Sequence, residues 1–247
     1  MANILEVKNL CKSYGKFDAV RGIDFSIAKS EIFALIGPNG AGKSTTLKMI
    51  ASVLQPSSGS IVIDGVDAVK NPEEARTKIS YLPEEAGAYK RLSGRGYLQF
   101  MAGLYTDDPS KQKEYIARAV EICGLGRRLD DKLGAYSKGM TRKVMLARAL
   151  MSNPELAILD EATSGLDVIN ALEIRDIIKS FTKNGMSILV SSHNMLEIEY
   201  LSDRVAIIDQ GKIIETGSTA ELKKKHQAEN LEVVFLKLKR HNVSSRT

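Results

Sequence analysis

The sequence predicts an α/β protein in which helices flank a mostly parallel sheet, with an N-terminal antiparallel β subdomain and an inserted α-helical subdomain. Short, almost wholly apolar runs at residues 31–36 and 156–159 suit strands that are covered on both faces. Helical patterns begin soon after these runs, at residues 43–51 and 168–183. Between about residues 84 and 153, helical periods replace the strand-like runs, which indicates an insertion made of helices.

The other expected elements follow from local patterns along the chain. Alternating apolar and polar residues at 4–10 and 22–28 predict half-buried strands. Gln210-Gly211 separates two strand-like runs and predicts a hairpin. The remaining expected strands lie at 61–63, 79–82, 186–191, 204–209 and 212–215, and the remaining expected helices at 96–105, 109–123, 137–151 and 194–201.

The length of 247 residues suits one large domain with an insertion. We expect this domain to span residues 1–225, with its core at about 1–84 and 153–225 and the helical subdomain at about 85–152. Residues 226–247 form a C-terminal tail to which the sequence assigns no structure.

Composition indicates a soluble, cytosolic chain. It is 43% hydrophobic and 26% charged, and no apolar run approaches the roughly 18 to 20 residues that span a bilayer. The N-terminus lacks the pattern of a signal peptide. Cys11 and Cys123 have no metal-ligand spacing and are expected to be reduced thiols.

The net charge of +5 is compatible with a nucleic-acid binder, but the basic residues are interleaved with acids. The local exceptions, at residues 223–225 and 237–240, suit solvated helix faces better than a nucleic-acid patch. We therefore expect no nucleic-acid partner.

The strongest motif follows the strand at 31–36 and matches G-x-x-x-x-G-K-[ST]. Glycines let backbone N–H groups turn inward around phosphate oxygens, and the following helix directs its positive end at the same anion. Lysine supplies a charge to the β- and γ-phosphates, and the serine hydroxyl binds Mg²⁺. The alternative is a glycine-rich structural turn. The loop consists of Gly37, Pro38, Asn39, Gly40, Ala41, Gly42, Lys43 and Ser44, and Thr45 follows it as a further expected ATP-binding residue.

Two carboxylates supply the second half of such a P-loop NTPase site. Asp160 and Glu161 end the apolar run at 156–159, where parallel sheets place their ligands. Asp160 is expected to hold Mg²⁺, and Glu161 to orient or deprotonate the attacking water. A structural acidic pair is the alternative. GTP is disfavoured because no [NT]-K-x-D motif is present, so we expect ATP as substrate with Mg²⁺ as cofactor.

Four further features complete a pattern: the run 136–140 (Tyr-Ser-Lys-Gly-Met), the run 164–167 (Ser-Gly-Leu-Asp), His193 after a strand, and Tyr14 ahead of the phosphate loop. Their order and spacing resemble the nucleotide-binding subunits of ATP-binding cassette (ABC) transporters. The resemblance covers residues 4–222, nearly the whole chain.

The resemblance implies a role for each matching residue. Tyr14 would stack on adenine, and His193 would bond the γ-phosphate and join Lys43 and Glu161 in catalysis. Ser137 and Gly139 would bind ATP held by a second copy of this chain or by a paralogue. Asp167 would communicate across that dimer. The plainer alternatives are surface packing for Tyr14 and a strand cap for His193.

Two positions depart from the common family pattern. Met140 stands where the signature usually has glutamine, and Glu84 stands where a glutamine usually binds Mg²⁺ and senses the membrane partner. A carboxylate also binds Mg²⁺, so Glu84 remains an expected metal ligand. Both departures resemble the exporter branch, which includes multidrug, sodium and polysaccharide efflux systems.

The expected function is ATP hydrolysis that powers export through a separate polytopic membrane permease. The chain would sit on the cytoplasmic face of the membrane, with the permease near Glu84 and residues 89–105. The alternatives are a soluble ABC ATPase without a channel, an importer subunit, and a non-catalytic ATP-binding scaffold. The soluble ATPase is disfavoured because no coiled-coil or zinc insertion is visible, and the importer subunit because Glu84 replaces the usual glutamine. The scaffold is disfavoured because Glu161 and His193 are both present.

Overall fold

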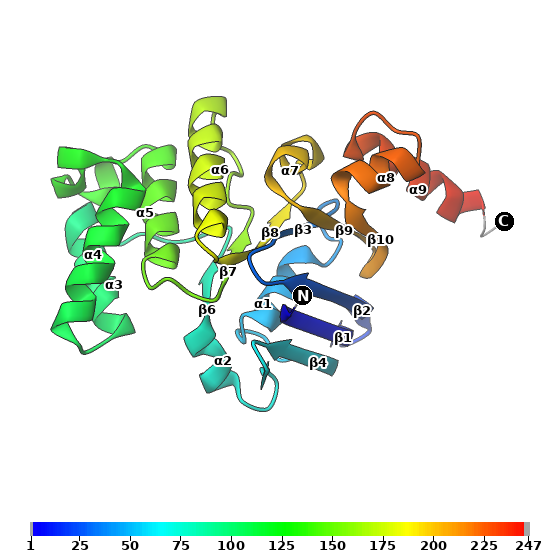
Figure 1. The fold of residues 1–247 in the computed structure, drawn as a ribbon, viewed down its shortest axis with the longest axis horizontal. Helices are drawn as coiled ribbons and strands as arrows, with labels where there is room; N and C mark the ends of the chain where they lie inside the picture. Colours follow the sequence, from blue (N-terminus) through cyan, green and yellow to red (C-terminus); the bar gives the residue numbers. More distant parts are fainter. Residues whose placement is uncertain (1, 245–247) are drawn as a thin grey trace.

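The computed structural model describes residues 2–244, and the side chains of residues 2–240. Its centre is a six-stranded sheet (Figure 1). Five strands run parallel, and the last strand pairs antiparallel as a hairpin at one edge. In spatial order the strands are β10 (Lys212–Ser218), β9 (Arg204–Asp209), β3 (Ile32–Ile36), β8 (Ser187–Ser192), β7 (Leu156–Asp160) and β6 (Ile79–Leu82).

Every residue of β3, β7 and β8 is buried, as expected for strands that carry layers on both faces. Loops after β3 and β7 therefore emerge at the same edge of the sheet, at the carboxyl ends of their strands. This edge carries the phosphate loop and Asp160.

A four-stranded antiparallel sheet covers one face of the central sheet (Figure 1). Its order is β2 (Phe17–Ala28), β1 (Asn3–Tyr14), β4 (Ser58–Ile63) and β5 (Val66–Asp67). Helix α1 (Lys43–Ile50) packs between the two sheets through Leu47 and Ile50. The short helix α2 (Pro72–Lys78) has no counterpart among the expected elements, although Pro72 occupies the position in its first turn that proline favours.

The helical subdomain stands at the β6 end of the molecule (Figure 1). It contains α3 (Gly94–Tyr105), α4 (Pro109–Cys123), the short 3₁₀ helices η1 (Gly126–Asp130) and η2 (Leu133–Ala135), and α5 (Lys138–Leu150). Each of its three α-helices begins and ends within two residues of the expected bounds. Helices α6 (Val168–Lys183) and α7 (Met195–Leu201) cover the face of the central sheet opposite to the antiparallel sheet. The predicted fold class is confirmed.

The C-terminal segment is helical. Helices α8 (Thr219–Lys225) and α9 (Leu231–Ser244) follow the hairpin, and Leu231 and Val234 of α9 are fully buried. The backbone N–H of Leu231 donates to a carboxylate oxygen of Glu199 on α7, at 3.1 Å. The sequence assigned no structure to this segment. Among residues 2–244, no helix is long and apolar enough to cross a membrane.

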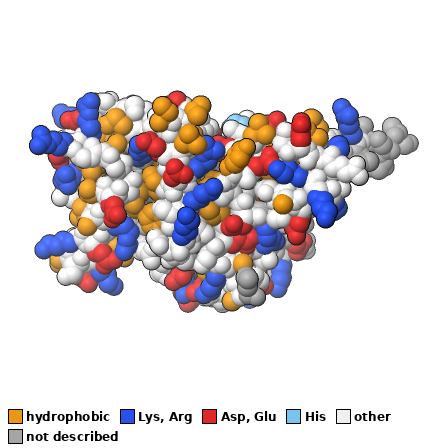
Figure 2. Space-filling view, turned by 45° about the horizontal axis from the view of Figure 1, so that its top comes forward, with side chains coloured by type: hydrophobic (Ala, Val, Ile, Leu, Met, Phe, Trp, Pro, Cys, Tyr) orange, Lys and Arg blue, Asp and Glu red, His pale blue; other side chains and the backbone are white. Residues whose placement is uncertain are grey.

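Several lysines of the two basic C-terminal runs pair with carboxylates of the chain itself. Lys223 lies 2.7 Å from Glu199, and Lys225 lies 2.9 Å from Glu215. Figure 2 shows Lys and Arg interspersed with Asp and Glu over the face that it presents. Nearby carboxylates thus compensate the positive charge of Lys223 and Lys225.

Candidate active site

The phosphate loop connects β3 to α1, and two of its glycines occupy backbone conformations that other residues rarely adopt. Gly40 has φ of +78° and Gly42 has φ of +108°. Gly37 is required by packing, because a Cβ atom there would collide with the backbone carbonyl oxygen of Ile208. The glycine pattern therefore serves both the turn and the close approach of β9.

Lys43 folds back over this loop. Its Nζ atom donates to the carbonyl oxygens of Gly37 and Pro38, at 2.8 and 3.3 Å. The same atom lies 3.6 Å from a carboxylate oxygen of Glu161, and each of these two side chains is 6% exposed. Burying an ammonium and a carboxylate is costly unless they are paired, so this contact compensates both charges.

Asp160 lies at the end of β7 and is buried with hydroxyl groups around it. One carboxylate oxygen accepts hydrogen bonds from Ser44 Oγ at 3.2 Å and Ser191 Oγ at 2.5 Å. The hydroxyl of Tyr81 lies 3.5 Å from the other oxygen. Burial, and then the charge of Asp160, raises the pKa of Tyr81, so this hydroxyl stays protonated as a donor.

These oxygens are the ligand type that Mg²⁺ prefers, and Ser44 and Asp160 already lie together. Within the described part of the chain, no group of three or more His, Cys, Asp or Glu could hold a metal ion. A magnesium ion here would therefore need phosphate or water oxygens to complete its six ligands, which is its usual way of binding at phosphate sites.

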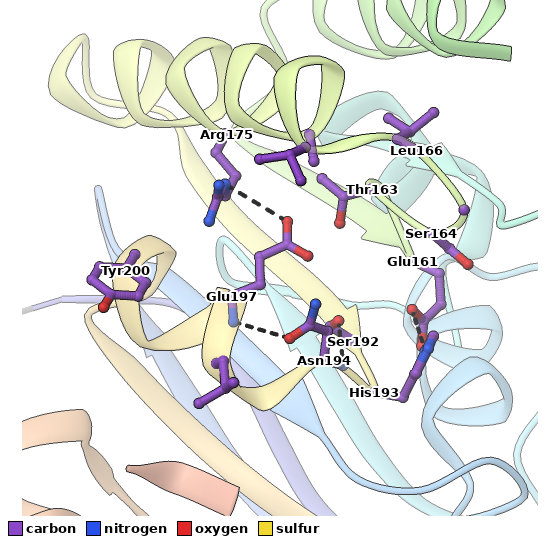
Figure 3. A pocket seen from close by; sticks show the side chains of 14 residues that line it. Glu161, Thr163, Ser164, Leu166, Arg175, Ser192, His193, Asn194, Glu197 and Tyr200 are labelled. Carbon is purple, nitrogen blue, oxygen red and sulfur yellow. Dashed lines mark hydrogen bonds and ion pairs between the residues drawn. The ribbon is translucent and has the colours of Figure 1, made fainter. Parts of the chain in front are cut away.

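Glu161 has a strained backbone and a well-fixed side chain. Its φ of +49° lies in the left-handed region, where a glutamate is uncommon. Its carboxylate lies between two cations or donors: Lys43 on one oxygen, and His193 Nδ1 at 2.9 Å from the other. Figure 3 shows the side chains of Glu161 and His193 pointing toward one another, although 32 residues separate them in the chain.

A cavity of about 390 Å³ opens in front of the phosphate loop. Tyr14, half exposed, lies at this cavity, and Lys12 Nζ is 5.3 Å from its ring centroid. Phe17, which pairs with Tyr14 across the first hairpin, also lies there; the sequence analysis missed it, although an aromatic side chain three residues from Tyr14 was a usable signal. The lining residues are Tyr14, Phe17, Ala19, Asn39, Gly40, Gly42, Lys43, Ser44, Thr45, Glu84 and Glu161.

A second cavity of about 380 Å³ adjoins the first at Glu161 and runs between α6 and α7 (Figure 3). Arg175 of α6 and Glu197 of α7 face one another across it, with Nε and Oε1 3.9 Å apart.

Asp167 caps the start of α6 by accepting from the backbone and side chain of Asn170, at 3.0 and 2.6 Å. These hydrogen bonds lower the pKa of Asp167.

Ser137 and Gly139 lie apart from the phosphate loop. Ser137 caps α5 by accepting from the N–H of Met140 at 3.2 Å. Gly139 is buried against Asn170, and a Cβ atom at this position would collide with the Asn170 side chain. Neither residue is among those that line the cavity of the phosphate loop. Within one chain, the two predicted parts of the ATP site are thus separate.

A comparison with known protein families identifies the family to which the chain belongs. The family model for ABC transporters matches residues 20–164, which is more than half of the chain. The chain belongs to the ABC transporter family.

Individual relatives of this ABC ATPase agree with the family match. It is 39% identical to the linearmycin resistance ATP-binding protein LnrL of Bacillus subtilis, over 89% of this chain and 70% of the relative. It is 34% identical to the daunorubicin/doxorubicin resistance ATP-binding protein DrrA of Streptomyces peucetius, over 98% of this chain and 72% of that one. A solved ATP-binding subunit of an ABC transporter superposes with a TM-score of 0.85 at 30% identity, covering 96% and 99% of the two chains.

These findings confirm the resemblance that the motifs indicated. The ABC ATPase binds and hydrolyses ATP, and the predicted enzyme class is confirmed.

Proposed function

We propose that this ABC ATPase powers export through a separate polytopic membrane permease, at the cytoplasmic face of the membrane. The observation that carries the hydrolytic part is the convergence of Lys43, Glu161 and His193 beside the phosphate loop. The names of the relatives LnrL and DrrA, both resistance ATP-binding proteins, support export as the coupled process.

In the proposed reaction, Lys43 binds the β- and γ-phosphates while Glu161 orients and deprotonates water. The observed ion pair supports an order of events. Phosphate oxygens would attract Lys43 away from Glu161, so the carboxylate becomes available as a base when ATP is present. His193 then holds the freed carboxylate through its Nδ1 atom.

Ser44 and Asp160 would hold Mg²⁺, and Glu84, which lines the same cavity, is a further carboxylate for it. When bound, the ion neutralises charge on the phosphates. Asp160 keeps its orientation through Ser191, which donates from behind.

The adenine ring is assigned to Tyr14. An aromatic side chain at the rim of the cavity offers a stacking surface, and Phe17 extends it. Tyr14 lines one cavity together with several residues of the phosphate-loop region, which suits a single nucleotide; these are Asn39, Gly40, Gly42, Lys43, Ser44 and Thr45.

We assign completion of the site to a second subunit, a copy or a paralogue. ABC ATP-binding subunits dimerise, and Ser137 and Gly139 lie away from their own phosphate loop. Figure 2 shows hydrophobic side chains gathered over the region of α6 and α7. The exposed apolar residues there are Val168, Ile169, Leu172, Leu196 and Tyr200. Asp167 begins α6 and would lie at this contact.

The permease is assigned to the aromatic surface near Glu84. Tyr89 and Phe100 are 58% and 46% exposed, and their rings meet edge to face with centroids 5.7 Å apart. Large exposed aromatic side chains are characteristic of the centre of protein interfaces.

The ATPase part is tested with purified chain and MgATP. Lys43→Ala should weaken ATP binding by about 1.5–3 kcal/mol, since it removes charge-assisted hydrogen bonds to phosphate. Lys48→Ala, an exposed lysine on the same helix, is the matched control and should bind ATP as the natural chain does. Unchanged affinity in Lys43→Ala would contradict the phosphate-loop assignment.

The export part is tested by isolating the tagged chain from detergent-solubilised membranes. We expect a polytopic membrane protein to co-purify, and Tyr89→Ala with Phe100→Ala to reduce its recovery. Reconstituted with its ATP-binding side outward, the complex should accumulate substrate in vesicles when MgATP is added. Recovery of the chain without any membrane partner would overturn the proposal.

A further inference from the structure

Arg142 of α5 makes a dense set of contacts that the proposed reaction does not yet use. Its guanidinium donates five hydrogen bonds, each to a backbone carbonyl oxygen. Three acceptors lie at the end of β7 and directly after it, namely Asp160 at 3.0 Å, Glu161 at 2.6 Å and Ala162 at 2.7 Å. The other two follow β6, namely Pro83 at 3.3 Å and Glu84 at 3.1 Å.

The contact with Glu161 matters because of that residue's strained backbone. The N–H of Glu161 donates to the carbonyl oxygen and the Oγ of Ser191, at 3.2 and 3.1 Å. Its carbonyl oxygen accepts from Arg142. Hydrogen bonds at both ends of the residue hold its left-handed conformation, and this conformation directs the Cα–Cβ bond toward Lys43 and His193.

The same guanidinium binds the segment that carries Glu84. Arg142 therefore joins three parts of the molecule: the start of α5, the chain after β7 and the chain after β6. Arginine suits this place because its planar fork holds five donors in a fixed geometry, which a lysine cannot reproduce. Burial lowers the pKa of Arg142, while the nearby charges of Asp160, Glu84 and Glu161 oppose that effect.

We propose that Arg142 is a positioning residue for hydrolysis: it fixes the backbone of Glu161, and thereby the direction of its carboxylate, and ties it to Glu84 and to the start of α5. This inference rests on the proposed role of Glu161 as the base. Ser137 caps α5 and Gly139 lies in its first turn, so the same tie connects the hydrolytic carboxylate to the part of the chain assigned to the other ATP of a dimer.

The test compares Arg142→Met with Arg148→Met in the full-length chain. Arg148 lies on the same helix and donates to the carbonyl oxygen of Tyr81 on β6 at 2.9 Å, so it also joins α5 to the sheet. Within the described part of the chain, Arg148 donates no hydrogen bond to the backbone of Glu161 or Glu84, so its variant shows how far a loss of stability alone lowers kcat.

We expect Arg142→Met to lower kcat about 10- to 100-fold, the effect of misplacing a reacting group by about 1 Å. Its Kd for ATP should stay within about threefold, because the phosphate loop is untouched. Arg148→Met should change kcat less than threefold. Its loss of thermal stability should be similar, as expected when about one to three hydrogen bonds are removed. Arg142→Lys, which retains three donors, should recover part of kcat.

Equal kcat losses in Arg142→Met and Arg148→Met would overturn the inference, as would a loss of ATP affinity that accounts for the whole effect. Should the methionine variant fail to fold, Arg142→Lys and Arg142→Gln decide the matter, and full kcat in both overturns it. Glu161→Gln separates the two proposals. If it hydrolyses normally, the role of Glu161 is wrong; if it is inactive while Arg142 variants are normal, only the present inference is wrong.

Discussion

His193 and Glu161 meet at 2.9 Å between Nδ1 and a carboxylate oxygen, while the other oxygen of the same carboxylate lies 3.6 Å from Lys43 Nζ. His193 is about half exposed, and Glu161 is 6% exposed. The carboxylate is thus held by the half-exposed His193 on one oxygen and by the buried Lys43 near the other. These contacts fix its position and leave the cavity in front of it open.

Glu161→Gln should abolish most turnover while leaving ATP binding intact. The amide keeps the shape of the side chain but cannot accept a proton from water, so kcat should fall about 10²- to 10⁴-fold. Steady-state hydrolysis and a nucleotide titration measure the two effects. Glu155→Gln, an exposed glutamate at the opposite end of β7, is the control and should hydrolyse normally. Normal turnover in Glu161→Gln would show that another group is the base.

His193→Ala should lower kcat at least about tenfold, because the freed carboxylate of Glu161 loses the contact that directs it. His226, directly after α8, offers a matched control, since it also contacts a glutamate, Glu215 of β10, at 3.1 Å. We expect His226→Ala to leave kcat unchanged. A comparable loss in both variants would indicate that stability, and not the position of Glu161, is responsible.

Tyr14→Ala should weaken ATP binding by about 1–3 kcal/mol, the range for stacking of a base on an aromatic side chain. Tyr14→Phe should bind normally, because the ring remains. Isothermal titration with ATP and with inorganic tripolyphosphate distinguishes ring contacts from phosphate contacts. If tripolyphosphate affinity falls as far as ATP affinity, Tyr14 acts on the loop and not on adenine.

Gly139→Ala should destabilise the fold even without nucleotide, because the new Cβ meets the Asn170 side chain. Overpacking of this kind costs about 1–3 kcal/mol in the free energy of unfolding. Gly103→Ala in α3, where an added Cβ has no neighbour within 4 Å, should instead stabilise the chain by about 0.5–1 kcal/mol. Urea denaturation measures both. Stabilisation by Gly139→Ala as well would show that the Asn170 side chain moves aside and would contradict this prediction.

Cys123 should resist thiol reagents in the folded chain. Burial raises its pKa to about 12, so at pH 8 only about one thiol in 10⁴ is the reactive thiolate. Cys11 is only partly buried and should react. A colorimetric thiol titration at pH 8 should count one thiol per folded chain and two in denaturant. Raising the pH should speed the reaction of Cys123, because its thiolate fraction increases. Two thiols that react at equal rates at pH 8 would contradict the burial of Cys123.

Elements with a strong local pattern were predictable from the sequence, including the apolar strands β3 and β7 and the periodic helices α3 to α6. The short helix α2 was missed because it buries one small side chain, Ala75, so no apolar stripe marks it in the sequence. Helix α9 was missed because its apolar residues are interleaved with lysines, and its burial depends on contacts with α7, such as that of Leu231 with Glu199. Those contacts are invisible in a single chain segment.

The phosphate loop was determined by the sequence alone, because its glycines, its lysine and the helix behind it are local neighbours whose chemistry depends on spacing. The family followed from the order of several such local motifs. Only the tertiary structure decided that the Glu161 carboxylate directly contacts both His193 and Lys43. Arg142 shows the physical reason most clearly. Its five acceptors are backbone carbonyl oxygens, which every residue carries, so no pattern of side chains could have marked them before folding placed them around one guanidinium.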